Sequence, residues 1–245
     1  MKAMIFAAGL GTRLKPLTDR LPKALVQVGG LPMLQRVLDR VVEAGCRKIA
    51  VNVHHFPGLI REFLAQLSHP GIEIFVSDES DGLLDTGGGL LRAASFLSGE
   101  EPVLVHNVDV ISTLDLKKMA ELHATSGALA TLAVRNRKTS RYLLFDDRMR
   151  MAGWLNRSTG VVRMAGSAGD RQTIALAFSG IQIIDPSFFS LVTRKGSFSL
   201  IDAYLDLAAR YPVCGYRDDA SLWIDIGNPG QLQEAGNMAA RGLLP

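Results

Sequence analysis

Short apolar runs alternate with amphipathic segments along the first half of the chain. The runs are typical of buried strands and lie at residues 2–7, 48–53, 72–76, 102–106 and 128–134. The segments between them carry apolar residues at helical spacing, most clearly on one face made of Met33, Leu34, Val37, Leu38, Val41 and Val42. That helix is predicted to end at Gly45, and others are predicted at residues 58–67, 87–97 and 116–125. This series predicts a mostly parallel sheet with helices on both faces.

The second half of the chain has a different pattern. Residues 142–145 and 149–154 flank Asp146-Asp147-Arg148, which predicts a hairpin, and further strands are predicted at 161–162 and 173–184. Residues 166–170 are expected to form an exposed turn. Helices at 186–192 and 200–210, strands at 213–216 and 221–225, and a helix after Pro229 complete the chain. We interpret this half as a small substrate lobe over the carboxyl edge of a Rossmann-like, three-layer α/β/α sandwich with a mixed, mostly parallel sheet.

Composition favours an ordinary globular enzyme-sized domain. The 245 residues fit one large α/β domain, with 47% hydrophobic and 21% charged residues. No stretch approaches the roughly 20 apolar residues of a membrane span, and the first apolar run is strand-sized. We therefore expect a cytoplasmic protein without a signal peptide or membrane partner. Cys46 and Cys214 have no C-x-x-C neighbours, which favours two buried, reduced thiols.

The charge pattern does not favour a nucleic-acid partner. The formal net charge is +3, and the basic cluster of Arg135, Arg137, Lys138 and Arg141 has no aromatic residues interleaved with it. We interpret this cluster as a solvated face. The histidines lack the spacing of a zinc site.

The glycine-rich turn after the first strand is the main candidate for chemistry. The strand leads into Ala7-Ala8-Gly9-Leu10-Gly11-Thr12-Arg13-Leu14, and outward-facing amides in such a turn bind anions. Arg13, Lys15 and Lys23 add positive charge, so the turn predicts a polyphosphate site. The Walker pattern is absent, and Leu14 stands where a dinucleotide fingerprint needs its third glycine. The long segment 15–31 before the first helix is typical of a functional loop.

Two aspartates follow strands whose carboxyl ends are expected at the same edge of the sheet. Asp109 follows the strand at 102–106, and Asp225 ends the strand at 221–225. Two carboxylates there suit Mg²⁺, although either aspartate taken alone is more typical of a turn or helix cap. The glycines at 87–89 open a predicted helix, which indicates either close backbone approach to a ligand or a flexible helix start.

The motifs resemble those of the sugar-nucleotidyltransferase family, whose members join a nucleoside triphosphate to a sugar 1-phosphate. Residues 9–18 with Pro22-Lys23 reproduce the family's G-x-G-T-R-L-x-P-L-T loop and its following P-K. Further matches are Thr86-Gly87-Gly88-Gly89, Asn107-Val108-Asp109, Phe178-Ser179-Gly180 and Trp223-Ile224-Asp225-Ile226-Gly227. The family usually has glycine where Val108 stands, and a β-branched residue there predicts an extended backbone.

The resemblance implies a role for each matching residue. It assigns Asp109 and Asp225 to Mg²⁺, and Arg13 and Lys23 to catalysis. The nucleotide contacts it implies are Ala8, Gly9, Gly11, Thr12, Arg13, Gly87, Gly88 and Asn107. The sugar contacts it implies are Ser179 and Gly180, and we add Asn156 as a further candidate donor to the sugar. Residues 1–135 would then form the nucleotide-binding half and residues 136–245 the sugar-binding half of a single domain, active as a monomer or small homo-oligomer.

The resemblance also implies substrates. It is greatest to the short bacterial uridylyltransferases that act on N-acetylmuramate 1-phosphate in cell-wall recycling, which implies UTP and that sugar phosphate. A guanylyltransferase that uses GTP with mannose or heptose 1-phosphate, and a cytidylyltransferase acting on a phospho-alcohol, are alternatives. A non-catalytic homologue that binds an NDP-sugar as a regulatory subunit is a third. Retention of Arg13, Lys23, Asp109 and Asp225 argues against the last.

Overall fold

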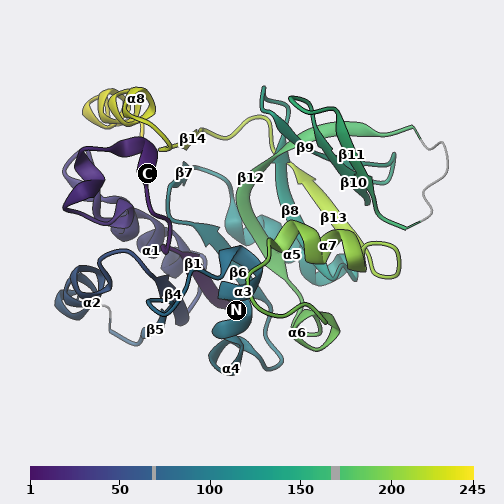
Figure 1. Cartoon of the computed structure of the whole chain (residues 1–245), viewed down its shortest axis with the longest axis horizontal. Helices are drawn as coiled ribbons and strands as arrows, with labels where there is room; N and C mark the ends of the chain where they lie inside the picture. The colour runs from purple at the N-terminus through teal and green to yellow at the C-terminus, as the bar shows by residue number, and fades with distance from the viewer. Residues whose placement is uncertain (68–69, 167–171) are drawn as a thin grey trace.

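The predicted alternation of strands and helices is present in the computed structural model, which describes residues 1–67, 70–166 and 172–245 (Figure 1). The strands are β1 (Lys2–Phe6), β2 (Gln27–Val28), β3 (Leu31–Pro32), β4 (Lys48–Val53), β5 (Glu73–Asp78), β6 (Val103–Asn107), β7 (Val110–Ser112), β8 (Ala130–Arg135), β9 (Arg141–Phe145), β10 (Met151–Asn156), β11 (Val161–Met164), β12 (Ile174–Ile184), β13 (Val213–Arg217) and β14 (Trp223–Asp225). The α-helices are α1 (Met33–Glu43), α2 (Pro57–Gln66), α3 (Asp85–Arg92), α4 (Ala94–Leu97), α5 (Leu116–Ser126), α6 (Phe188–Leu191), α7 (Leu200–Leu207) and α8 (Pro229–Ala240). Three 3₁₀ turns, η1 (Thr12–Leu14), η2 (Leu17–Asp19) and η3 (Lys23–Leu25), shape the long loop after β1.

The central sheet is mixed. Strands β5, β4, β1 and β6 run parallel to one another, and β12 pairs antiparallel to β6. On the far side of β12 lies antiparallel β8, which in turn pairs parallel to β13. The predicted Rossmann-like α/β class with a mostly parallel, mixed sheet is confirmed.

Helices cover both faces of this sheet because its buried strands are apolar on both sides. Along β1, Ala3 and Ile5 face one hydrophobic cluster, which includes residues of α1, α2 and α5. The intervening Met4 faces a second cluster, to which α3, α4, α6 and α7 contribute. This alternation of side chains along a strand places one helical layer on each face.

Strand β12 belongs to both halves of the molecule. Its last residues, from Ile181, pair with β6, whereas residues Ile174 to Leu176 pair with β9. Its pairing with β8 shifts register between Phe178 and Gln182. Ser179 and Gly180 therefore lie where the strand changes partner, and Figure 1 shows β12 running from the central sheet into the smaller lobe.

The smaller lobe is made of β9, β10 and β11. The predicted hairpin is confirmed: β9 and β10 are antiparallel, and the Asp146 carboxylate accepts hydrogen bonds from the amides of Arg148 and Arg150. Strand β11 pairs with the outer edge of β10. Of the turn predicted at 166–170, Gly166 is exposed with φ 66°, and residues 167–170 lie outside the described residues.

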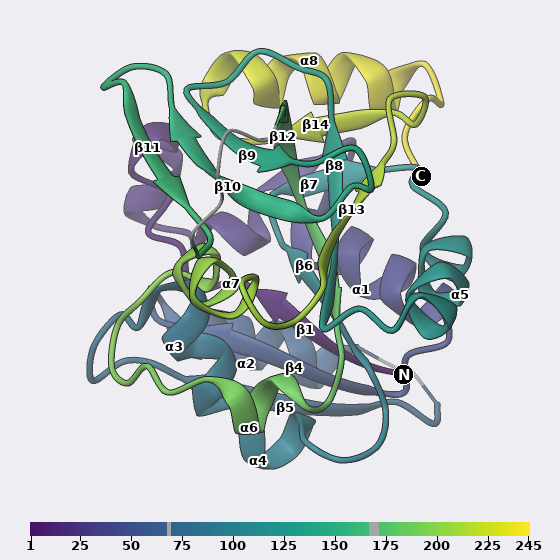
Figure 2. The ribbon, with the colours of Figure 1, turned by 90° about the vertical axis from the view of Figure 1, so that its right-hand side faces the viewer.

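Strand β14 does not join the central sheet, contrary to its expected place at the sheet's carboxyl edge. It pairs antiparallel with β7, a strand that the sequence pattern did not predict, and the two form a separate ribbon. A third cluster, which includes Ile111, Ile224 and Ala235, packs this ribbon against α8. Figure 2 shows α8 lying alongside β14.

Three further details differ from the predictions. The helix expected at 87–97 begins at Asp85 and is divided into α3 and α4 at Ala93. Both cysteines are free as expected, but Cys214 is only half-buried, whereas Cys46 is buried. Val108 lies in the turn between β6 and β7 rather than in extended backbone, and it keeps a negative φ.

In the residues described, no helix has both the length and the apolar character needed to cross a membrane.

Candidate active site

The loop after β1 is shaped by a left-handed glycine. Gly11 has φ 65°, and a Cβ at this position would lie 2.8 Å from Cγ2 of Thr18. The Gly11 carbonyl accepts hydrogen bonds from the amide of Leu14 and the hydroxyl of Thr18, at 2.8 and 2.9 Å. Only glycine can adopt this left-handed conformation easily and also leave room for the Thr18 side chain. Gly11 therefore fixes the course of the predicted anion-binding loop.

Two adjoining cavities form a cleft beside this loop. A cavity of about 340 Å³ is lined by Gly9, Gly11, Thr12, Arg13, Lys23, Asp109 and Gly227, among others. A cavity of about 410 Å³ is lined by Ala8, Gly9, Asn52, Glu79, Asp85, Thr86, Asn107 and Asp109, among others. Because Phe6, Gly9, Leu83 and Asp109 line both cavities, the cleft runs without a break from the loop to the start of α3.

Lys23 and Asp109 form an ion pair at the floor of the cleft. The Lys23 side chain is buried because η3 holds it beneath the loop. Asp109 lies in the turn after β6 and remains partly accessible. The ammonium of Lys23 and the carboxylate of Asp109 thus meet where the two cavities adjoin.

Asp225 lies next to Asp109. It ends β14, pairs with Val110 of β7, and is followed by Ile226, whose amide donates to the Asp109 carbonyl at 2.8 Å. Burial raises the pKa of Asp225, and the nearby negative charge of Asp109 raises it further. Lys23, Arg13 and Arg137 oppose this rise in the pKa of Asp225.

The Asp109–Asp225 pair fits a divalent cation. The Oδ1 atom of Asp225 is buried and has no hydrogen-bond partner among the residues that the structure describes. An unpartnered carboxylate oxygen close to a second carboxylate is a donor set that hard cations such as Mg²⁺ accept. In the same described part of the chain, no group of three or more histidine, cysteine, aspartate or glutamate side chains offers an alternative metal site.

Arg13 borders the other side of the cleft. Its side chain is exposed, and a Cβ at Gly227 would lie 3.0 Å from Nη2 of Arg13. The absence of a side chain at Gly227 therefore leaves room for the guanidinium to lie against the segment that carries Asp225. Arg13, Lys23, Asp109 and Asp225, drawn from three distant parts of the sequence, are brought together as the motifs predicted.

Arg137 is a further residue of this site that sequence reasoning missed. Its Nη2 donates to the Phe178 carbonyl at 3.0 Å, and its Cζ lies 4.3 Å from the centre of the Trp223 ring. Burial lowers the pKa of Arg137, and the charge of Asp225 counteracts part of that effect. The interpretation of the basic cluster as a solvated face is therefore wrong for Arg137. Its position just beyond β8, at the edge that also carries the aspartates, was the available signal.

The glycines of α3 serve protein packing. A Cβ at Gly87 would lie 2.2 Å from the Phe198 ring, and one at Gly88 would lie 2.3 Å from the Gly196 carbonyl oxygen. The amide of Gly87 already donates to the Phe198 carbonyl at 2.8 Å. At Gly87 and Gly88 the close approach that the triple glycine predicted is made to the segment before α7, and Asp85 and Thr86 line the cleft.

A buried polar pair supports the loop from below. Nδ2 of Asn52 donates to the Glu79 carboxylate at 2.7 Å, and its Oδ1 accepts from the amide of Ala7 at 2.7 Å. The Glu79 side chain also accepts from the amide of Leu84 at 3.1 Å. These contacts fix the end of β1 relative to the wall of the second cavity. No spacing in the sequence indicated this pair.

Of the three residues assigned to the sugar, the structure brings Ser179 and Gly180 to the site but not Asn156. Gly180 has φ 77°, and a Cβ there would lie 2.9 Å from Nδ2 of Asn107, which lines the cleft. The Ser179 carbonyl accepts from the Trp223 indole at 2.8 Å, so both residues border the site. Asn156 is not brought to them. Its side chain accepts from the amide of Ser158 in the β10–β11 turn and lines neither cavity of the cleft.

Comparison with known proteins gives the same picture. The family model described as nucleotidyl transferase matches residues 2–144. The N-acetylmuramate α-1-phosphate uridylyltransferase of Caulobacter vibrioides is 34% identical over 235 residues, covering 93% of this chain and 92% of that protein. The mannose-1-phosphate guanyltransferase of Yarrowia lipolytica is 30% identical over 232 residues, covering 94% of this chain but 61% of that protein. The structure of UDP-glucose pyrophosphorylase from Acinetobacter baumannii shares the fold, with a TM-score of 0.76 at 19% identity, covering 96% of this chain and 91% of that one. The chain therefore belongs to the nucleotidyl transferase family and is a sugar 1-phosphate nucleotidyltransferase.

Proposed function

We propose that this enzyme makes a UDP-sugar and pyrophosphate from UTP and N-acetylmuramate 1-phosphate, with Mg²⁺ as its cofactor. The observation that carries the catalytic part is that Arg13, Lys23 and Asp109 line one end of a continuous cleft and that Asp225 lies beside them. Nucleotidyl transfer at the α-phosphorus requires alignment of the reactants and neutralised charge rather than covalent help from the protein. The basic side chains of Arg13 and Lys23 and the carboxylates of Asp109 and Asp225 would provide both the alignment and the neutralising charge.

The roles follow from the chemistry of each side chain. Arg13 presents a planar fork of donors that suits the leaving pyrophosphate, and Lys23 presents a point charge that suits the α-phosphate or the sugar phosphate. Asp109 and Asp225 would hold Mg²⁺. Mg²⁺, when bound, supplies positive charge that stabilises the phosphate oxygens as the bond to pyrophosphate breaks.

The ion pair of Lys23 with Asp109 suggests how the site is kept ready for substrate. Without substrate, each charge satisfies the other in a partly buried place. Asp109 would help to hold the cation, and the ammonium of Lys23, which lies beside that carboxylate, is placed to bind a phosphate oxygen of the substrate.

The choice of substrates rests on the relatives. The Caulobacter uridylyltransferase matches this chain over nearly the full length of both proteins, whereas the Yarrowia guanyltransferase extends well beyond the matched region. This favours UTP with N-acetylmuramate 1-phosphate. GTP with mannose 1-phosphate is the second candidate, because the Yarrowia protein is 30% identical over the shared region.

A substrate matrix tests the proposal. Purified enzyme would be given each NTP with N-acetylmuramate, mannose, glucose or heptose 1-phosphate, and pyrophosphate release would be followed with Mg²⁺ and then with EDTA. We expect release that depends on Mg²⁺ and is greatest with UTP and N-acetylmuramate 1-phosphate. Greatest release with GTP and mannose 1-phosphate would establish the second candidate. If no pair of substrates releases pyrophosphate but an NDP-sugar still raises the melting temperature, the protein would be a non-catalytic binding protein.

A further inference from the structure

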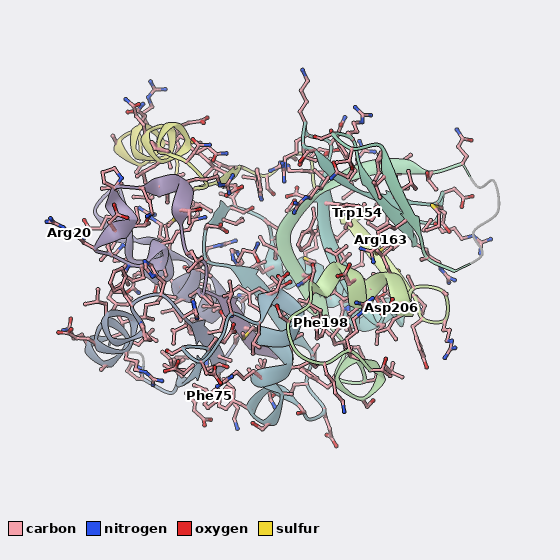
Figure 3. The ribbon with its side chains drawn as sticks, viewed as in Figure 1. Arg20, Phe75, Trp154, Arg163, Phe198 and Asp206 are labelled. Carbon is pink, nitrogen blue, oxygen red and sulfur yellow. The ribbon has the colours of Figure 1, made fainter. Side chains whose placement is uncertain are left out.

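A separate cavity of about 340 Å³ lies between the smaller lobe and the start of α7. The residues in its wall that matter here are Arg137, Arg141, Arg163, Tyr142, Trp154 and Asp202. Arg163 lies opposite Trp154 across the β10–β11 pair, and Figure 3 labels both in this lobe. The cavity is thus formed by β9, β10 and β11 on one side and the beginning of α7 on the other.

This cavity is positively charged. Three arginines line it against one aspartate, and that aspartate, Asp202, already accepts a hydrogen bond from Arg163 at 2.6 Å. Within the described ranges 1–67, 70–166 and 172–245, no ion pair is formed by Arg137 or Arg141. The Nε atom of Arg137 is, in addition, buried without a hydrogen-bond partner there. The guanidinium of Arg141 is therefore available to an anion, and Arg137 has one N–H, that of Nε, without a partner among the residues that the structure describes.

The cavity borders the proposed catalytic centre through Arg137. The guanidinium of Arg137 covers the Trp223 ring, and Trp223 lies two residues before Asp225. Its Nη2 is bonded to Phe178, which lines the cavity and directly precedes Ser179. A molecule whose phosphate lies near Asp225 would therefore extend its other end past Arg137 toward Arg141.

The walls of the cavity also suit a sugar ring. The wall contains the aromatic side chains of Tyr142 and Trp154, and Arg157 and Arg163 lie over their rings, at 5.0 and 6.0 Å from the ring centres. Aromatic side chains suit ligands that are apolar on one face and hydroxylated elsewhere. A sugar phosphate whose ring carries no charged group would leave the guanidinium of Arg141 without an anionic partner in this cavity. Charged groups at a binding site are best satisfied by a ligand of opposite charge.

We propose that this cavity receives the acceptor sugar and that Arg141, with Arg137, binds a carboxylate carried by that sugar in addition to its phosphate. This inference rests on the proposed function and names the residues that would select an acidic sugar 1-phosphate over one whose sugar ring carries no charged group. A carboxylate attached to the ring through an ether, as in N-acetylmuramate, would meet the requirement.

The test compares two sugar phosphates that differ only in this group. N-acetylglucosamine 1-phosphate is N-acetylmuramate 1-phosphate without the lactyl ether that carries the carboxylate. We expect wild-type kcat/KM to be at least about tenfold higher for the acidic sugar, because a charge-assisted hydrogen bond is lost with the other. We expect Arg141→Gln to lower kcat/KM for the acidic sugar by about tenfold, mainly through KM, and to leave the value for N-acetylglucosamine 1-phosphate unchanged.

Arg148→Gln is the matched control, because Arg148 is an exposed arginine at the other end of β9 and does not line the cavity. It should alter neither sugar's kcat/KM. Equal wild-type values for the two sugars, or an equal loss for both in Arg141→Gln, would overturn the inference while leaving the nucleotidyltransferase activity established. The wild-type comparison decides alone if Arg141→Gln does not fold. Failure of every sugar phosphate with every NTP would instead refute the proposed function.

Discussion

At the scale of single residues, the carboxylate of Asp225 is held where its ionised form is disfavoured. Burial and the neighbouring Asp109 both raise its pKa, and one of its oxygens has no partner among the described residues. Such an arrangement destabilises the protein when no cation is bound. It is retained, we infer, because the same two carboxylates bind the metal.

Asp225→Asn should therefore separate stability from activity. A carboxyl whose pKa is raised by folding stabilises the protein below its unfolded pKa, and that contribution is lost as pH rises through the folded pKa. At neutral pH the wild-type protein without metal bears this penalty, and the uncharged amide does not. We expect the variant to melt at a higher temperature without metal, to be stabilised less by Mg²⁺, and to lose at least about a hundredfold in kcat.

Differential scanning fluorimetry with and without Mg²⁺, beside pyrophosphate release, measures both effects. Asp218→Asn provides the control, since Asp218 is another acidic residue near β14, but its carboxylate accepts a hydrogen bond from the amide of Ser221 and it is not among the charges that act on Asp225. A variant with full kcat would contradict the metal assignment. A lower melting temperature in the absence of metal would contradict the electrostatic argument.

The residues of the predicted anion-binding loop and the two aspartates could be predicted because local sequence motifs contain them. Gly11 needs a left-handed backbone, and Asp109 and Asp225 each follow an apolar run that predicts a strand. Arg137 could not be assigned in the same way, because its role depends on stacking on Trp223, which lies far along the chain. Asn156 was proposed as a sugar donor without a motif to carry it, and its side chain accepts a hydrogen bond within the turn that follows it.

At the scale of elements, α3 shows a conflict between helix propensity and packing. Alanine is favoured over glycine inside a helix by about 1 kcal/mol. At Gly88, however, a Cβ would lie 2.3 Å from the backbone oxygen of Gly196 and 2.9 Å from the Leu84 side chain. Backbone cannot move aside as the end of a flexible side chain can, so the clash outweighs the propensity.

Gly88→Ala should consequently destabilise the protein by about 1 to 3 kcal/mol in urea unfolding. Gly236→Ala in α8 is a matched control, because a Cβ there meets nothing within 4 Å. That variant should stabilise the protein by up to about 1 kcal/mol. Equal effects of the two substitutions would show that α3 is not held by close packing.

The elements that sequence patterns predicted best are the long ones with a consistent period. β4 and α1 begin where their apolar spacing begins. β7 was missed because its three residues follow a two-residue turn and show no period of their own. The position of β14 was predicted wrongly for the same reason, because β14 pairs with β7 rather than with the central sheet.

At the scale of the whole molecule, buried histidines connect stability to pH. Burial lowers the pKa of His106 from 6.5 to about 4, and burial lowers the pKa of His123 as well. The unfolded chain gains protons at these sites before the folded protein does, so stability is complete above the unfolded pKa and declines as pH falls. For His106 the full range corresponds to roughly 3 kcal/mol.

We expect the free energy of unfolding to fall between about pH 6.5 and about pH 4, and His106→Gln to show a shallower fall over that range. Urea unfolding at several pH values measures the slope. At lower pH a second decline is expected, because a hydrogen bond from Ser80 lowers the pKa of Asp78, and one from the N-terminal amine lowers that of Glu101. An unchanged slope in His106→Gln would assign the first decline to other groups.

The continuity of β12 has a mechanical consequence. One strand carries hydrogen bonds to the nucleotide side through β6 and to the smaller lobe through β9, so the two sides cannot rotate freely about a flexible linker. Any movement that narrows the cleft must bend the strand, and bending is easiest where its pairing is already interrupted, at Ser179 and Gly180. Ser179 and Gly180, which border the site, would therefore be the hinge of any such bending.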